Sequence, residues 1–320
     1  MAGDPEDIGF AGVVGICSEA VKILRSYTRH FLSMAGTLVL PLGVVLLSQS
    51  FVSDPLLRKL TQMGRNNQRL DAEFVGLYLI AVLYLVFVLA LSLFATAAIV
   101  YSVACIYTGK GLSYMKVIRV VPNVWSRLIH TFLWAHILLS FYYAAFVALL
   151  LALFLIQEST QVSMTMIMIP SIIVFNVFLV HFNLVWHLAS VVSVLEDTKG
   201  VCAMKRSNAL IAGKRLAGFY LFVIYASCIL FMLGLFSGGL AKQNTSGRVF
   251  LTITLLVVWT TVTLLAIVIQ SIFYFVCKSY HQERIDRSAL AQKLDGYLGD
   301  YTPLSDPVSA GAPNGELEQI

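Results

Sequence analysis

Six long stretches of this chain contain no Asp, Glu, Lys or Arg, and they constrain its fold more than any other feature. A helix needs about 20 apolar residues to cross a hydrocarbon core about 30 Å thick. Composition agrees, because 58% of the residues are hydrophobic and only 12% are charged, against about 25% charged in a soluble domain. We therefore predict an all-α polytopic transmembrane helix bundle. Its six spans lie within residues 31–53, 74–109, 128–157, 159–195, 216–241 and 249–277.

Two features of these stretches predict departures from straight, minimal spans. Pro41 lies inside the first stretch. Proline is tolerated in a membrane helix but kinks it, so we expect a kink there. The stretches 74–109 and 159–195 are longer than one crossing requires, so their helices should tilt or project beyond the bilayer.

The distribution of Lys and Arg predicts the orientation of the spans. Short cytosolic loops collect these residues. The N-terminal segment, the second and fourth loops and the tail together hold 16 of them, and the loops on the other side hold 6. We therefore predict cytosolic termini, with an amphipathic helix in 1–30, a transmembrane domain in 31–277 and a tail, a short helix followed by a disordered stretch, in 278–320.

The loop 52–73 runs against this orientation, because its four cations would lie outside the cytosol. The sequon at Asn244 would lie on the same side, in a loop too short for its glycosylation to be predicted.

Two loops on the predicted cytosolic side resemble each other. The segment KGLSYMKVIRVVPNVWSRL at 110–128 is similar to KGVCAMKRSNALIAGKRL at 199–216, and a fainter copy precedes the first span. Repetition at a fixed interval indicates a repeated structural unit. We read the chain as three parallel repeats of a cytosolic amphipathic helix followed by a transmembrane hairpin. Chance similarity between basic linkers is the alternative.

The basic linkers suit the cytosolic headgroup layer. In the first linker, Ile16, Val21, Ile23 and Leu24 alternate with cations, as in a helix that dips apolar side chains into the membrane. Anionic headgroups attract such cations. Simple anchoring of the fold is the more common role of linkers like these. The cations that we assign to the linkers are Lys22, Arg25, Lys116, Arg119, Lys205, Arg206, Lys214 and Arg215.

Four phrases resemble a known family. They are GICSEAVKILR, LPLGVVLLSQSFVSDPL, VLEDTKGVCAMKRSNALIAGKRLAGF and FVCKSYHQERIDRSALAQKLDGYLGDYTPL. They are similar to a plant family of uncharacterised six-span membrane proteins, which implies plant origin. The third phrase is also distantly similar to the membrane domain of some bacterial glycerophosphodiester phosphodiesterases. This chain has no room for their catalytic barrel, so the resemblance carries over no catalytic residue.

Polar side chains form a stripe along the fourth span. Asn176, Asn183, His187 and Ser190 share one helix face, because their spacings of 7, 4 and 3 return to nearly the same angle. The stripe is either a substrate or lipid headgroup site near the bilayer middle or a set of interhelical hydrogen bonds, and the second is the more common use of such residues. His130 and His136 are six apart and cannot face one site, which argues against a metal centre.

Charged and small residues near the spans predict structure more than chemistry. Glu196 and Asp197 should pair with Lys199, Lys205 or Lys214. Gly36 and Gly43 should allow close helix packing in the first span. No charged residue lies in mid-span, and no Ser/His/Asp or paired-carboxylate arrangement is present. We therefore expect no enzymatic activity, no catalytic residue, no metal and no cofactor.

Three function classes follow. The first is a non-enzymatic organiser or adaptor of plant endomembranes, in the endoplasmic reticulum or another endomembrane, or in the plasma membrane. Its partners would be lipids, with anionic headgroups possible, and cytosolic proteins, without nucleic acid. The alternative is a carrier or lipid-handling transporter that uses the polar stripe. An intramembrane enzyme ranks last.

Overall fold

The computed structural model describes residues 12–48, 58, 59, 61, 72–157, 164–240 and 245–282. All the secondary-structure elements in these ranges are helices. Asn244 and the tail beyond residue 282 lie outside these ranges, and so does almost all of loop 52–73. The helices are α2 (Val13–Ser26), α3 (Thr28–Met34), the π-helical η1 (Ala35–Val39), α4 (Leu40–Leu47), α6 (Ala72–Tyr107), α7 (Tyr114–Gln157), α8 (Met164–Leu195), α9 (Val201–Ile211), α10 (Arg215–Leu240) and α11 (Thr245–Tyr280).

Six helical segments are long and apolar enough to cross a membrane, which confirms the predicted number of candidate spans. They are Thr28–Leu47, Val75–Tyr107, Tyr114–Phe154, Met168–Leu195, Arg215–Phe236 and Val249–Tyr280. The second and fourth lie in α6 and α8, which have 36 and 32 residues. At about 1.5 Å per residue these helices are about 54 and 48 Å long, well beyond one hydrocarbon core. The protein is therefore a multi-pass membrane protein by the length and composition of its helices.

The first span changes its helix type just before Pro41. Residues Ala35–Val39 form the π-helical η1, and α4 then starts at Leu40 with Pro41 in its first turn. Proline has no N–H to donate and its ring crowds the carbonyl four residues earlier. A π-helical turn is one of the standard ways in which a helix changes course. The helix thus changes type directly before Pro41, the position where we expect a kink.

The second basic linker does not form a separate helix. Proline normally breaks a helix, so from the sequence Pro122 predicts a short or bent helix before the third span. Instead α7 is one helix of 44 residues with Pro122 inside it. A proline inside a membrane-protein helix is tolerated where neighbouring groups satisfy the freed carbonyl. The linker and the span are therefore continuous here, whereas α2 and α9 are separate helices.

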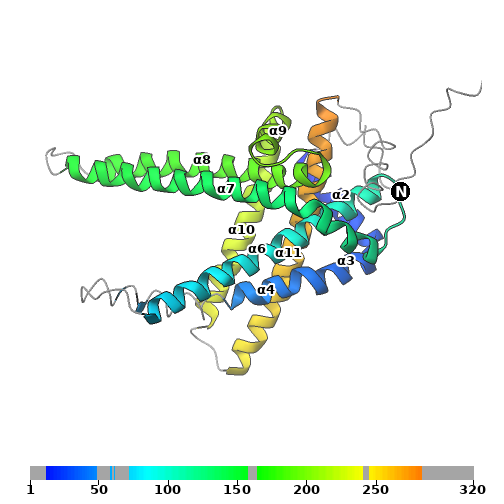
Figure 1. Cartoon of the computed structure of the whole chain (residues 1–320), viewed down its shortest axis with the longest axis horizontal. Coiled ribbons are helices and arrows are strands. Elements are labelled where there is room, and N and C mark those ends of the chain that lie inside the picture. Colours follow the sequence, from blue (N-terminus) through cyan, green and yellow to red (C-terminus); the bar gives the residue numbers. More distant parts are fainter. Residues whose placement is uncertain are drawn as a thin grey trace, which may run out of the picture.

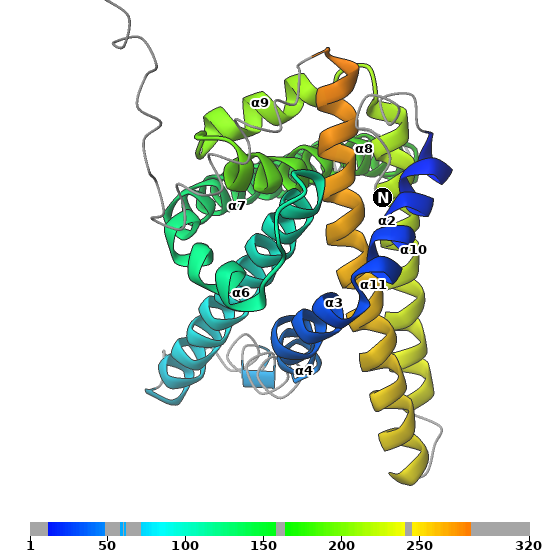
Figure 2. The same ribbon diagram turned by 90° about the vertical axis from the view of Figure 1, so that its right-hand side faces the viewer.

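The spans pair into three hairpins that diverge from a common region (Figures 1 and 2). The first span pairs with α6, α7 with α8, and α10 with α11. The turns 108–113, 196–200 and 212–214 all lie where the hairpins converge, together with α2 and α9. We call this the linker end. The predicted cytosolic linkers therefore lie at one end of the bundle.

The core of the protein is concentrated at the linker end. Residues 97–107 of α6 and 271–277 of α11 are all buried, with Ala98, Val103, Ile272 and Cys277 each 0% exposed. The far ends of the hairpins are different, because large apolar side chains such as Phe141 are exposed there. Exposed apolar surface of this kind suits contact with lipid acyl chains.

Two glycines of the first span have opposite environments. A Cβ on Gly43 would lie 2.7 Å from the Trp259 ring and 2.8 Å from Leu256, so α4 packs closely on α11 at this point. A Cβ on Gly36 would meet nothing within 4 Å. The expectation of close packing is confirmed for Gly43 and wrong for Gly36, because Gly36 faces away from the neighbouring helices.

Candidate functional site

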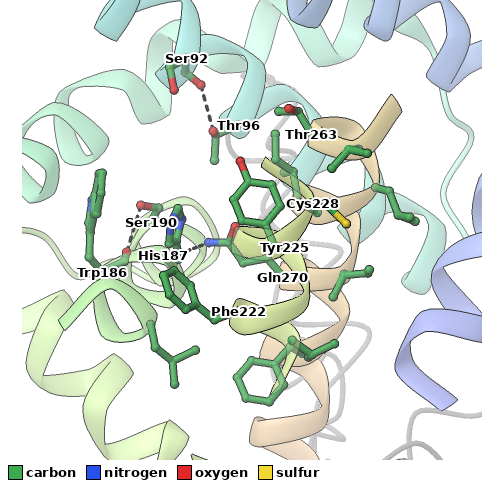
Figure 3. A pocket seen from close by; sticks show the side chains of 18 of the residues that line it. Ser92, Thr96, Trp186, His187, Ser190, Phe222, Tyr225, Cys228, Thr263 and Gln270 are labelled. Atoms are coloured by element: carbon green, nitrogen blue, oxygen red, sulfur yellow. Dashed lines mark hydrogen bonds between the residues drawn. The ribbon is translucent and has the colours of Figure 1, made fainter. Parts of the chain in front are cut away.

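A cavity of about 480 Å³ lies between the diverging hairpins, and we call it the central cavity (Figure 3). It is partly open to the outside of the protein. Side chains of α4, α6, α7, α8, α10 and α11 line it, together with Cys17 of α2. Most of them are apolar, and the volume falls within the range of about 300–1,000 Å³ of small-molecule sites. An apolar molecule or the apolar part of an amphiphile fits such a cavity.

The polar groups of the central cavity are all uncharged in their ordinary states. All but Cys17 come from five spans, in α6, α7, α8, α10 and α11, and Figure 3 labels most of them. No Asp, Glu, Lys or Arg occurs among the lining residues that the structure describes. The polar lining residues are Cys17, Ser92, Thr96, His136, Trp186, His187, Ser190, Tyr225, Cys228, Trp259, Thr263 and Gln270, of which Cys17 lies in α2.

His187 occupies a central position among these groups. The Gln270 side-chain amide donates a hydrogen bond to the backbone carbonyl of His187, which ties α11 to α8. The imidazole stacks on Trp186 with ring centroids 5.1 Å apart, and the Phe222 ring of α10 lies tilted to it with centroids 6.5 Å apart. The ring therefore faces the cavity between aromatic neighbours.

The predicted polar stripe divides between two environments. His187 and Ser190 line the central cavity, but Asn176 and Asn183 do not. The side-chain amides of both asparagines donate hydrogen bonds, each 2.8 Å long, to backbone carbonyls four residues earlier in α8. Asn176 lies about 16 Å along α8 from His187, at about 1.5 Å per residue, where the hairpins have diverged. One helix face thus begins in the cavity and ends at an exposed position.

The two histidines of α7 are separated as expected. His136 lines the central cavity, stacks on Phe132 with centroids 3.8 Å apart and meets Trp186 edge to face. His130 is exposed, and its Nδ1 lies 2.8 Å from the Ser126 carbonyl. In the described part of the chain, no group of three His, Cys, Asp or Glu side chains is placed to hold a metal ion.

Most of the assigned linker cations are exposed at the linker end. The side chains of Arg206 and Lys214 are half-buried, and Lys214 lies over the Tyr280 ring with its Nζ 5.2 Å from the ring centroid. The other six are exposed: Lys22, Arg25, Lys116, Arg119, Lys205 and Arg215. These six side chains belong to α2, the first turns of α7, α9 and the start of α10, and we call them the rim of exposed cations.

The apolar face of the first linker helix is buried in protein, so our expectation that it dips into lipid is wrong. In α2, Ile16 and Ile23 are 0% and 3% exposed, because this face packs against α11 and the rest of the core. Leu24 packs partly against the same core, and only Val21 is exposed. Helix α9 likewise buries Leu210 and its neighbours against the bundle. These apolar faces are therefore buried in protein, whereas Lys22, Arg25 and Lys205 on the same helices stay exposed.

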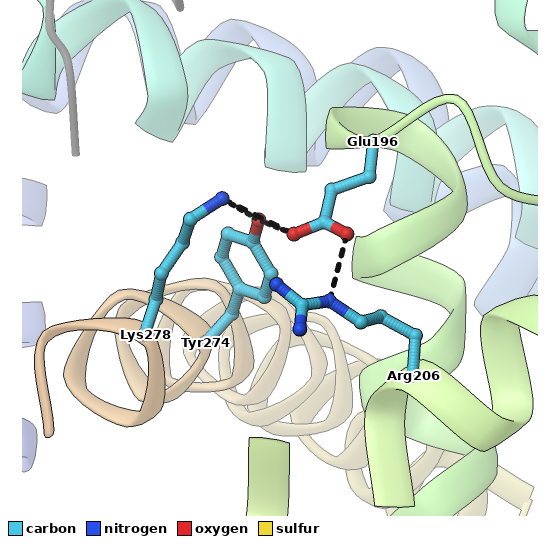
Figure 4. Close-up of polar contacts among 4 residues, drawn as sticks. All are labelled: Glu196, Arg206, Tyr274 and Lys278. Atoms are coloured by element: carbon cyan, nitrogen blue, oxygen red, sulfur yellow. Dashed lines mark hydrogen bonds and ion pairs between the residues drawn. The ribbon is translucent and has the colours of Figure 1, made fainter. Parts of the chain in front are cut away.

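A polar cluster surrounds the Glu196 carboxylate at the linker end (Figure 4). One oxygen of Glu196 accepts hydrogen bonds from Tyr274 Oη at 2.7 Å and Lys278 Nζ at 3.2 Å, and the other accepts from Arg206 Nε at 3.2 Å. Burial alone raises the pKa of Glu196, but the Tyr274 hydrogen bond and the Lys278 and Arg206 cations outweigh it, so the pKa lies below its usual value. The carboxylate is therefore held in its charged form.

The acidic pair has partners that sequence spacing did not identify. Asp197 pairs with Arg127 of α7, Nη1 to Oδ1, and Arg127 also reaches the Glu196 carbonyl at 3.4 Å. We expected partners among Lys199, Lys205 and Lys214, all within twenty residues. The ion pairs found for Glu196 join α8 to α9 and α11 instead. Pairing was the correct interpretation, but distant helices supply most of the partners.

Sequence reasoning also missed several cavity residues. Gln270 is the only amide in the last charge-free stretch, and this isolated polarity was a usable signal. Thr96 and Tyr225 gave no such signal, because hydroxyl groups are scattered through all the spans.

The comparison with known proteins identifies one family. A family model described as "Domain of unknown function (DUF8558)" matches residues 1–309, almost the whole chain. No curated protein and no solved structure matches.

Proposed function

The chain belongs to the DUF8558 family, and from the geometry of its central cavity we propose that it binds a membrane lipid between its hairpins as a lipid-handling protein. The observation that carries the proposal is a partly open cavity of about 480 Å³ inside a set of membrane-spanning helices. An opening between spans meets acyl chains rather than water. Lipid is therefore the molecule at the highest local concentration there.

The depth of the polar groups supports a lipid whose polar part enters the bundle. His187 lies eight residues before the end of α8 at Leu195, and Gln270 lies ten residues before the end of α11 at Tyr280. At about 1.5 Å per residue these positions are about 12 and 15 Å from the linker end. Polar groups are expensive at this depth unless they are used or paired. A lipid that offers hydrogen bonds would satisfy them.

Filling the cavity tests the proposal. Ala266 of α11 lines the central cavity, whereas Ala145 of α7 is exposed on the outside of its hairpin. We expect Ala266→Phe to abolish the retention of lipid by the purified protein, measured by native mass spectrometry, and Ala145→Phe to leave it unchanged. Equal lipid retention in both variants would refute binding in this cavity.

An organiser or adaptor role is the second candidate, and the rim of exposed cations favours it. The rim would contact anionic headgroups or acidic cytosolic proteins through charge. Proximity labelling from the C-terminus in cells tests this role. Replacing Lys116 and Arg119 by Gln should then remove cytosolic neighbours, while Ala266→Phe should keep them. An unchanged neighbour list in the double variant would argue against the adaptor role.

The finer topology belongs to this proposal. Cytosolic termini are supported by the excess of Lys and Arg on the predicted cytosolic side. Three parallel repeats are supported by the basic segment that precedes each hairpin, namely α2, the first turns of α7, and α9. We place the protein in plant endomembranes or the plasma membrane on the resemblance of its linker and tail phrases. The absence of an enzymatic activity is likewise part of the proposal.

A further inference from the structure

The polar groups of the central cavity restrict the class of lipid that fits it. We infer that the occupant is a neutral lipid whose polar part is a hydroxyl, as in diacylglycerol, a sterol or a ceramide, rather than a phospholipid. This inference rests on the proposed lipid binding and names its substrate class. Two independent observations carry it. The described residues that line the cavity include no Asp, Glu, Lys or Arg, and three lining side chains can form hydrogen bonds with a ligand.

The first observation concerns charge. A phosphate group seated beside His187 would be buried about 12 Å from the linker end at about 1.5 Å per residue, and no described lining residue carries a positive charge. The half-buried cations Arg206 and Lys278 of the linker end already pair with Glu196. A buried ion without a partner is strongly unfavourable. The cavity therefore discriminates against anionic headgroups.

The second observation concerns hydrogen-bond donors and acceptors. The Ser190 and Thr96 hydroxyls donate their protons to carbonyls of their own helices, Trp186 O at 3.2 Å and Ser92 O at 2.9 Å. Each oxygen is then left as an acceptor that faces the cavity. Such oxygens can accept a hydrogen bond from a ligand that donates one. A lipid hydroxyl donates, whereas a phosphodiester only accepts.

His187 completes the match. A neutral imidazole offers one donor and one acceptor nitrogen. The His187 ring contacts the aromatic rings of Trp186 and Phe222. A single hydroxyl can accept from the imidazole and donate to an oxygen such as that of Ser190, one turn further along α8. The set thus fits a group that both donates and accepts.

Photolabelling of the full-length protein tests the lipid class. The protein is reconstituted in phosphatidylcholine vesicles with alkyne-tagged photoactivatable probes: a diacylglycerol, a phosphatidic acid with the same acyl chains, and a sterol. Labelled peptides are mapped by mass spectrometry. We expect the diacylglycerol or the sterol to label the lining segments of α8, α10 and α11 at least about tenfold more than phosphatidic acid, and the two neutral probes identify the source of the hydroxyl.

Matched variants assign the labelling to the central cavity. Ala266→Phe should remove it and Ala145→Phe should keep it. Thr96→Val conserves the shape of the side chain and removes one acceptor, so it should lower labelling by the neutral probe about 2- to 10-fold. This variant replaces Ala266→Phe in the test if Ala266→Phe does not fold.

The outcomes separate the two proposals. Equal or stronger labelling of the cavity by phosphatidic acid would overturn the neutral class while leaving lipid binding intact. An absence of cavity labelling by every probe would overturn both the class and the proposed function.

Discussion

The carboxylate of Glu196 accepts a hydrogen bond from the Tyr274 hydroxyl at 2.7 Å, across 78 positions of sequence. This contact joins the end of α8 to the last turns of α11, and Lys278 and Arg206 complete it from α11 and α9 (Figure 4). The cluster lies at the linker end, where the core is concentrated, and holds together the helices that diverge to form the central cavity. Its integrity should therefore control the stability of the whole bundle.

We predict that Glu196→Gln lowers the free energy of unfolding by about 1.5–3 kcal/mol, because hydrogen bonds to a charged, mostly buried group are lost. The measurement is thermal or denaturant unfolding in detergent. Asp197→Asn is the matched control, since the Asp197 side chain is 74% exposed and an exposed pair contributes about 0–1 kcal/mol. Equal losses in the two variants would show that the cluster has no special role.

The stability of the protein should also depend on pH through Glu196. Its pKa is lower in the folded state than usual, so the group stabilises the fold above the ordinary glutamate pKa of about 4.3. This contribution is lost as the pH falls through the folded-state pKa, because protonation removes the charge that Lys278 and Arg206 stabilise. A series of melting temperatures from about pH 7 to about pH 3.5 measures it. The acid loss should be smaller in Glu196→Gln, and an identical loss would assign it to other groups.

Gly43 should be essential for the contact between α4 and α11. An added Cβ would lie 2.7 Å from Trp259, closer than packed atoms tolerate. We predict that Gly43→Ala destabilises the protein by about 1–3 kcal/mol, the usual cost of overpacking. Gly36→Ala on the same span meets nothing within 4 Å and should be neutral or slightly stabilising. A neutral Gly43→Ala would mean that α4 is free to shift away from α11.

His187 should contribute to lipid binding through its ring. We predict that His187→Ala weakens labelling by a hydroxyl-bearing lipid probe about 2- to 10-fold, the value of one hydrogen bond. His130→Ala is the control, because His130 is exposed and outside the central cavity. Protein yield and melting temperature report whether each variant folds. If labelling is unchanged in a folded His187→Ala protein, the ring does not contact the lipid.

Cys202 offers a direct measurement of orientation. It is exposed on α9 at the linker end, whereas Cys105 and Cys277 are buried. In sealed vesicles, a membrane-impermeant maleimide should label Cys202 from the cytosolic side, and Cys202→Ser should remove that signal. Labelling from the lumenal side alone would reverse the predicted topology. Cys228 is also exposed, but it lies within the candidate span Arg215–Phe236, where acyl chains should keep an impermeant reagent away.

The spans illustrate what could be predicted from the sequence and why. A bilayer requires about twenty residues without charge, which is a local property of the sequence. All six candidate spans could therefore be predicted, and Pro41 lies next to the π-helical turn of the first span. The start of α7 was missed because helices tolerate proline inside a membrane protein when neighbours compensate, and neighbours are not visible in a local pattern.

The candidate site shows the opposite case. The spacing of His187 and Ser190 predicted that they share a face, yet the same spacing included Asn176, which lies outside the cavity. The spacing carries no information about where along α8 the neighbouring hairpins diverge. Gln270, Thr96 and Tyr225 line the cavity only because their helices diverge at this level of α8.

The sequence by itself determined which segments cross the membrane, which connectors share one end and where the cations lie, because these follow from the cost of charge in hydrocarbon. The tertiary structure alone decided which apolar faces are buried and where a cavity remains. Inside a bilayer, lipid and protein are equally apolar, so hydrophobicity does not mark the packed face, and close fits such as Gly43 against Trp259 and distant bonds such as Glu196 to Tyr274 determine the arrangement.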